Sequence, residues 1–174
     1  MQKRNNMINN AFLSAYDDYA AGILRHIYLR VNSKEVSEDL TQETFFKAWD
    51  NIVKNGTDVR NYKTFLFKIA NNLIIDYYRR KAKPVVPIDS ISPDETSIAE
   101  TQSKETENNI NKSLIEEFLF ELSDEHRQII IFRYVNDFSV KEISDMTGRS
   151  KNSINVIIHR SIKYIKNEIK KKYV

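Results

Sequence analysis

The chain has 174 residues, 41% of them hydrophobic, which excludes disorder throughout and allows one large or two small domains with buried cores. It has no cysteine and no apolar run near the roughly 20 residues that span a bilayer, which excludes disulfides, thiol chemistry and membrane spans, so we expect a soluble, cytoplasmic protein. The net charge of +3 conceals two basic segments, residues 60–83 and 149–174, flanking an acidic one at residues 84–113, and this pattern indicates two nucleic-acid contacts joined by a tether.

Two long helices are predicted at the start of the chain. Only 3 glycines and few alternating stretches occur, so the sequence is typical of a nearly all-helical protein. The first helix is expected from about Ile8 to Val31. Asn32, with Glu35 three residues later, is predicted to cap the second helix, which Gly56 ends. The core stripe of the first helix consists of Phe12, Tyr16, Tyr19, Ile23 and Ile27.

The second helix is acidic on one side and apolar on the other. Residues 39–49 read DLTQETFFKAW. Projected on a helix, the inward side holds Val36, Leu40, Ala48 and Ile52, and the outward side holds Asp39, Gln42, Glu43 and Asp50. Phe46 lies among the outward carboxylates, which indicates an anchor for a basic protein partner. The alternative is that the helix face is misassigned and that the ring packs inside a tight bundle.

A third helix is predicted from about Tyr62 to Lys83, where Pro84 stops it because the residue before a proline is pushed out of the helical region. Its core stripe consists of Tyr62, Leu66, Ile69, Ala70, Leu73 and Tyr77. The outward arc consists of Thr64, Phe67, Lys68, Asn71, Asn72, Tyr78 and Arg79. Interleaved rings and cations suit single-stranded DNA, although Phe67 and Tyr78 could equally pack against other helices.

Residues 84–112 contain all 3 prolines and no periodic apolar pattern, which predicts an acidic, flexible linker. A second helical unit begins near Ser113. Ser123 is predicted to cap one of its helices, and its core residues are Leu114, Phe118, Leu122, Ile129, Ile130 and Phe132. We therefore expect an all-α fold with two small domains, an N-terminal bundle at residues 1–83 and a C-terminal helix-turn-helix at residues 113–174.

The last third of the chain carries the signals of a helix-turn-helix. Ser139 and Glu142 have capping-box spacing, Gly148 ends the short helix that follows, and Ser150 caps a long basic helix. The inner face of the long helix consists of Ile154, Ile157, Ile158, Ser161, Ile162, Ile165 and Ile169, and its outward face of Asn152, Asn155, Val156, His159, Lys163 and Lys166. Such an outward face suits a DNA major groove, although a basic amphipathic helix can also be only a solvated cap.

The second and third helices resemble the extracytoplasmic-function (ECF) sigma factors of bacterial RNA polymerase, through DLTQETF and the following FLFKIANNLIIDYYRRK at residues 65–81. In that family the first segment docks on the clamp helices of the largest polymerase subunit. The resemblance therefore implies core-polymerase contacts by Asp39, Leu40, Thr41, Gln42, Glu43 and Phe46. The basic helix and the loop before it, Asn55 to Tyr62, would handle the melted proximal promoter element, with contacts by Arg60, Asn61, Tyr62, Lys68, Asn71, Asn72, Arg79 and Arg80.

Residues 122–166, from LSDEHRQIIIFRY to HRSIKYIK, resemble the sigma module that binds the distal promoter element. The expected contacts to that element are Arg149, Lys151, Asn152, Ser153, Asn155, Val156, His159, Arg160 and Lys163. The resemblance implies core RNA polymerase and promoter DNA, both duplex and melted, as partners. It also implies a possible anti-sigma factor. We expect no membrane contact and a monomer when the chain is free.

Enzyme chemistry finds no support in the sequence. His26, His126 and His159 lie far apart and none has the helical spacing of a metal site, so we expect no metal, no cofactor and no catalytic residue, and His26 is interpreted as a packing residue. Two other functions stay open: a stand-alone helix-turn-helix regulator whose N-terminal bundle dimerises or senses, and an RNA-binding or anti-termination protein.

Overall fold

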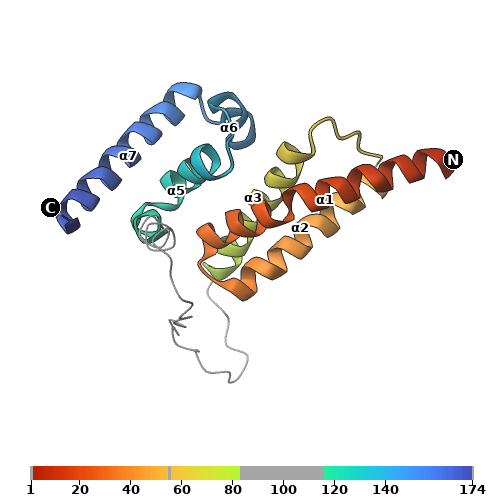
Figure 1. Ribbon diagram of the computed structural model, residues 1–174, viewed down its shortest axis with the longest axis horizontal. Coiled ribbons are helices and arrows are strands. Elements are labelled where there is room, and N and C mark those ends of the chain that lie inside the picture. Colours follow the sequence, from red (N-terminus) through yellow and green to blue (C-terminus); the bar gives the residue numbers. More distant parts are fainter. Residues whose placement is uncertain (1, 55, 83–115, 174) are drawn as a thin grey trace, which may run out of the picture.

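A computed structural model of the chain describes residues 2–54, 56–82 and 116–173, and within these ranges it is helical and contains no strand (Figure 1). The N-terminal bundle comprises α1 (Gln2–Val31), α2 (Lys34–Lys54) and α3 (Tyr62–Lys81). The C-terminal half comprises a helical turn at residues 116–121, α5 (Asp124–Ile130), the π-helical turn η1 (Ile131–Val135), α6 (Val140–Thr147) and α7 (Lys151–Tyr173). The expected all-α fold with its helix-turn-helix is confirmed, and the predicted linker at residues 84–112 lies outside the described residues.

Local sequence rules account for most helix ends. The side chain of Asn61 accepts a hydrogen bond from the backbone N–H of Thr64 at 3.0 Å and so caps α3. The predicted capping box of α6 is present, because Ser139 Oγ accepts from the Glu142 N–H at 3.2 Å and the Glu142 carboxylate accepts from the Ser139 N–H at 2.8 Å. Gly148 ends α6 at φ 71°, in the left-handed region that favours glycine.

Two predicted caps differ in the structure. Asn32 does not cap α2. It adopts φ 53° and donates its N–H to the Tyr28 carbonyl at 2.9 Å, which ends α1, because asparagine tolerates the left-handed region. The cap of α2 is Ser33, whose Oγ accepts from the Val36 N–H at 3.4 Å. Ser123 precedes α5 as predicted, but its side chain makes no capping hydrogen bond.

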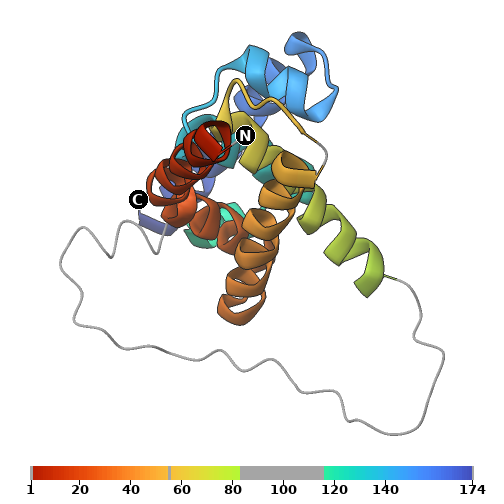
Figure 2. The same ribbon diagram turned by 90° about the vertical axis from the view of Figure 1, so that its right-hand side faces the viewer.

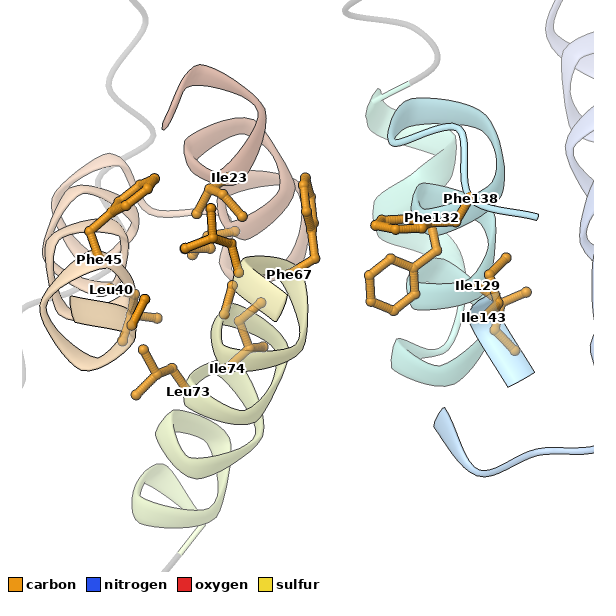
Figure 3. Packing of buried hydrophobic residues seen from close by; sticks show 14 of the residues in the cluster. Ile23, Leu40, Phe45, Phe67, Leu73, Ile74, Ile129, Phe132, Phe138 and Ile143 are labelled. Carbon is orange, nitrogen blue, oxygen red and sulfur yellow. The ribbon is translucent and has the colours of Figure 1, made fainter. Parts of the chain in front are cut away.

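The C-terminal half packs beside α1 and α3 (Figure 1 and Figure 2). One continuous apolar core therefore runs through both halves, from Ile23 and Phe45 in the bundle to Phe132 and Ile143 beyond it (Figure 3). Phe67 on α3 joins the two parts. The predicted stripe of α1 is mostly confirmed, since Ile23 and Ile27 are fully buried, Phe12 and Tyr19 are half-buried, and only Tyr16 is exposed. None of the helices in the described ranges is both long and apolar enough to cross a membrane.

A π-helical turn follows α5 and has no counterpart in the sequence-based prediction. At the end of η1 the N–H of Asn136 donates to the carbonyl of Ile131 at 3.0 Å, five residues back. The next residue, Asp137, has φ 54°, and the N–H of Phe138 then donates to the Phe132 carbonyl at 3.0 Å. This wide turn directs Asn136 and Phe138, both buried, toward the N-terminal bundle.

The capping box gives a stability prediction. Ser139→Ala removes an oxygen that accepts the Glu142 N–H, so the free energy of unfolding is expected to fall by about 0.5–2 kcal/mol. Urea denaturation followed by circular dichroism measures it. Ser144→Ala, which removes a hydroxyl that bonds the Arg149 carbonyl after the helix, is the matched control for loss of a serine hydroxyl from this region. Equal stability of Ser139→Ala and the wild type would contradict the prediction.

Candidate nucleic-acid and protein interfaces

The outward face of α2 presents an apolar ring among polar groups, as predicted. Phe46 is 67% exposed, and Asp39 and Gln42 beside it are exposed. Thr41 and Glu43 are half-buried, and the Glu43 carboxylate pairs with Lys47 at 2.9 Å. Because hydration of a bare phenyl ring is unfavourable and Phe46 adds nothing to the core, this face is suited to a protein partner.

One residue assigned to this face lies elsewhere, and one residue of the face was missed. Leu40 is only 5% exposed, because it lies on the inward side of α2 together with Ala48 and Ile52 in the shared core, so its side chain is not available at the outward face. Val53 is 54% exposed and follows Phe46 by seven residues, which is nearly two full helical turns. The i, i+7 spacing was the signal that could have identified it.

The basic face of α3 is partly as predicted. Lys68, Asn72, Arg79 and Arg80 are exposed, and so are Arg60 and Asn61 in the loop before the helix. Tyr62 is half-buried, and burial followed by the nearby Asp58 raises the pKa of its phenol. A groove of about 310 Å³ between α2 and α3 connects this face with that of α2, and it is lined by Glu43, Lys47, Leu73, Asp76, Arg79 and Arg80.

The C-terminal half covers the other edge of the outward arc that was predicted for α3. Asn71 is 5% exposed and Phe67 is 2% exposed, because Gln128 of α5 and Phe138 of the loop after η1 pack over this side of the helix. Tyr78 is half-buried and donates its hydroxyl to the Arg30 carbonyl at 2.6 Å. Asn71, which the sequence assigns to the DNA-facing surface, is therefore covered in this arrangement of the chain, and Phe67 takes the alternative that the sequence leaves open, packing against other helices.

The first turns of α7 present the predicted outward face. Lys151, Asn152, Asn155, Val156, His159, Arg160 and Lys163 are all exposed. Ser153 is half-buried, and its N–H donates to Ser150 Oγ at 3.2 Å, which confirms the predicted cap. Arg149 is exposed and pairs with Glu125 at 2.9 Å, so a phosphate at this position would compete with a carboxylate. Ile154, Ile157 and Ser161 face inward and are buried.

A groove of about 490 Å³ runs along the same face of α7 and was not predicted. Exposed Tyr134 from η1 forms one wall, and Ile158 and Ile162 contribute apolar surface. Its polar lining consists of Asn155, His159, Lys163, Lys166, Asn167 and Lys170. Among the described residues no group of three or more histidine, aspartate or glutamate side chains is placed to hold a metal ion.

Two family models match the chain. The model of sigma-70 region 2 matches residues 15–83, and the model of sigma-70 region 4 matches residues 112–165, so that together they cover more than half of the chain. They coincide with the bundle that carries Phe46 and with the half that carries the helix-turn-helix. The presence of both regions disfavours a stand-alone helix-turn-helix regulator.

Named relatives agree with the family models. The chain is 27% identical over 162 residues to RNA polymerase sigma factor YlaC of Bacillus subtilis, covering 90% of each protein. It is 28% identical over 153 residues to ECF RNA polymerase sigma factor SigL of Mycobacterium tuberculosis, covering 87% of this chain and 84% of that one.

Solved structures show the same fold. Sigma factor RpoE of Bartonella quintana, crystallised with the anti-sigma factor NepR, has a TM-score of 0.68 at 20% identity over 92% of this chain and 97% of that one. CnrH in complex with the cytosolic domain of CnrY has a TM-score of 0.67 at 16% identity over 93% of this chain and 89% of that one. On the two matched regions and the named relatives, the chain belongs to the sigma-70 family and is an ECF sigma factor of transcription initiation.

Proposed function

We propose that the outward face of α2 is the surface through which this sigma factor binds core RNA polymerase. The observation that carries the proposal is the exposure of Phe46 between Asp39, Gln42 and the Glu43–Lys47 pair, within the segment matched by sigma-70 region 2. A ring in such a place loses water-exposed apolar area only when a partner covers it. Val53 extends this surface along the helix, and half-buried Thr41 lies farther around α2 from Phe46.

The exposed cations of α3 and its preceding loop are suited to the melted proximal promoter element. Arg60, Lys68, Arg79 and Arg80 supply positive charge for the DNA backbone, while Asn61, Tyr62 and Asn72 supply amide and ring groups for unpaired bases. Arg79 already pairs with Asp76 at 3.1 Å, but the pair is exposed and is therefore weak and easily exchanged for a phosphate.

The outward face of α7 is suited to the duplex of the distal promoter element. Asn152, Asn155, Val156 and His159 are in position to read base edges, and the phosphate contacts fall to Arg149, Lys151, Ser153, Arg160 and Lys163. Support comes from the capped short helix, the glycine turn and the exposed first turns of α7, which together form a helix-turn-helix.

Substitutions on α7 test this division of roles. Lys163→Ala is expected to weaken binding to every promoter and to reduce the salt dependence by about one unit of slope, because it removes a phosphate contact. Asn155→Ala is expected to change the preference at one or two positions of the distal element by about 1–3 kcal/mol, because it removes a base contact. Titration of promoter variants with the reconstituted holoenzyme at several salt concentrations measures both effects.

The matched control for this test is Asn167→Ala, which removes an exposed amide farther along α7. It is expected to leave both sequence preference and salt slope unchanged. If Asn155→Ala behaves like Asn167→Ala, the outward face of α7 does not read bases and the assignment fails.

The proposal extends to the partners of this chain and to the compartment in which it acts. The chain acts by binding alone, in the cytoplasm with the polymerase, and an anti-sigma factor is a further partner, since the chain's structural neighbour RpoE was crystallised in complex with the anti-sigma factor NepR. Adding the purified chain to core polymerase and transcribing a library of promoter fragments tests the central claim. Absence of any promoter that depends on the chain would refute it.

A further inference from the structure

The outward arc of α3 carries a large apolar side chain, Ile75. This residue is 41% exposed, whereas the two residues before it, Leu73 and Ile74, are buried in the core of the bundle (Figure 3). Each helical residue turns the chain by about 100°, so the third residue of this apolar run lies on the far side of the helix from Leu73. Ile75 therefore lies outside the core, and its exposed apolar area is available to a partner.

Three polar residues that are proposed to meet DNA lie on the same line along α3. Asn72 lies one turn before Ile75 and Arg79 one turn after it, and both are exposed. Exposed Lys68 lies two turns before Ile75. These spacings place all four side chains within about 60° of one another around the helix axis. A partner that covers Ile75 must therefore also cover two cations and an amide, which are the groups that a nucleic acid requires.

DNA offers few apolar groups to an aliphatic side chain, and the C5-methyl group of thymine is the one that is displayed in the major groove. Isoleucine has no ring that could stack on an unpaired base, so it is better suited to this methyl group than to the face of a melted base. Ile75 also lies about 20 Å along α3 from Tyr62, at the end of the loop proposed to hold the melted bases. That distance corresponds to about six base steps, so Ile75 is placed to meet DNA that is still paired.

We propose that Ile75 determines sequence specificity by contacting the C5-methyl group of a thymine in the paired DNA next to the melted proximal element. The inference rests on the proposed role of α3 in binding that element. It adds a base preference that the cations of α3 do not supply, because contacts to phosphate carry no direct sequence information. Burial of one methyl group changes an affinity by about fourfold, which sets the size of the expected preference for thymine.

Replacement of thymine by deoxyuridine tests this contact, because it removes the methyl group and keeps the base pair. Thymine is placed in turn at each position of the proximal element and of its flanking base pairs, on either strand. Each promoter is then compared with its deoxyuridine counterpart by equilibrium binding of the reconstituted holoenzyme. At one position, the wild-type chain is expected to bind the thymine promoter about fourfold more tightly, and Ile75→Ala is expected to bind the two promoters equally.

Two further variants serve as controls. Ile75→Val keeps a branched apolar side chain and is expected to retain most of the preference for thymine. Leu24→Ala truncates a leucine that is 36% exposed on α1 and is expected to leave every thymine-to-deoxyuridine ratio unchanged. Alanine favours the helix and both positions are exposed, so the variants are expected to fold, which circular dichroism checks.

Equal binding of thymine and deoxyuridine promoters by the wild-type chain at every position would overturn the inference, and so would a preference that persists in Ile75→Ala. Failure of the proposed role of α3 would be recognised separately through Lys68→Ala. This variant is expected to weaken binding to both kinds of promoter equally, because it removes a phosphate contact. Unchanged binding of both by Lys68→Ala would show that α3 does not hold the promoter, and the assignment of Ile75 would fall with it.

Discussion

Replacing Phe46 with alanine and Glu43 with lysine is expected to weaken the binding of this sigma factor to core RNA polymerase by about 2–4 kcal/mol. The first change removes a ring that is 67% exposed and that has apolar area to lose in a complex. The second inverts a charge on the same face, which places like charges together if the partner surface is basic. Equilibrium titration of labelled full-length chain with core polymerase from the same organism measures the change.

The matched control for this variant lies on α1. Leu13 is 60% exposed, and Asp17 follows it by one helical turn on the same side. Leu13→Ala with Asp17→Lys therefore repeats an apolar truncation and a charge reversal on a helix that is not assigned to polymerase. Equal losses in the two double variants would show that the α2 face has no special role, and an unchanged affinity of the α2 variant would show the same.

Acidification is expected to change the chain from a closed form, with its two halves packed together, to an open form with the halves apart. His26 of α1 is buried between the halves, where it stacks on Phe132 at 4.9 Å and lies 2.9 Å from Oδ1 of Asn136. His26 in the closed chain has a pKa of about 3, whereas an open chain returns the ring to its ordinary value of 6.5. Between these values the open chain binds more protons, so this contribution to closure is fully present above about pH 6.5 and is lost as the pH falls toward 3. At pH 5 the open fraction is expected to be about 30-fold higher than above pH 7.

Energy transfer between dyes on Ala21→Cys and Asp145→Cys, recorded from pH 7.5 to 5 with helicity as a check, measures this effect. The charged or titratable groups facing the His26–Arg30 pair are Asp124 and Arg127 on α5 and Tyr78 on α3. The control is His26→Phe, which keeps a ring against Phe67 and Phe132 and removes the titrating nitrogen. A pH dependence that persists in His26→Phe would assign the effect to another group.

Rules that use only neighbouring residues predicted the structure correctly at several helix ends and on helices that bury only one face. The Ser139–Glu142 box and Gly148 have the predicted roles because each acts within four residues of its own position. The outward face of α7 is also as predicted, since an isoleucine stripe at helical spacing determines which side of the helix packs. The functions assigned to that face and to α2 stay predictions.

The same rules could not predict contacts between segments that lie far apart in the sequence. His26 and Asn136 are separated by 110 positions, and Asn71 and Gln128 by 57, so no periodic pattern in either segment reports that they meet. The sequence places Asn71 on the outward arc of α3 and leaves Phe67 open, because helical periodicity reports the faces of one bundle and does not report a second half packed on it. Packing of the C-terminal half then buried Phe67 and Asn71 and left Lys68 and Asn72 exposed.

Because of the π-helical turn, the number of residues in η1 determines how the two halves of the chain fit together. Each helical residue turns the chain by about 100°, so deletion of one residue within η1 would restore an ordinary α-helix and rotate everything beyond it. Asn136 and Phe138 would then point away from α1 and α3, whereas the internal packing of α6 on α7 would be retained. Insertions and deletions in this stretch would therefore let related chains diverge in how strongly they close while each keeps an intact helix-turn-helix.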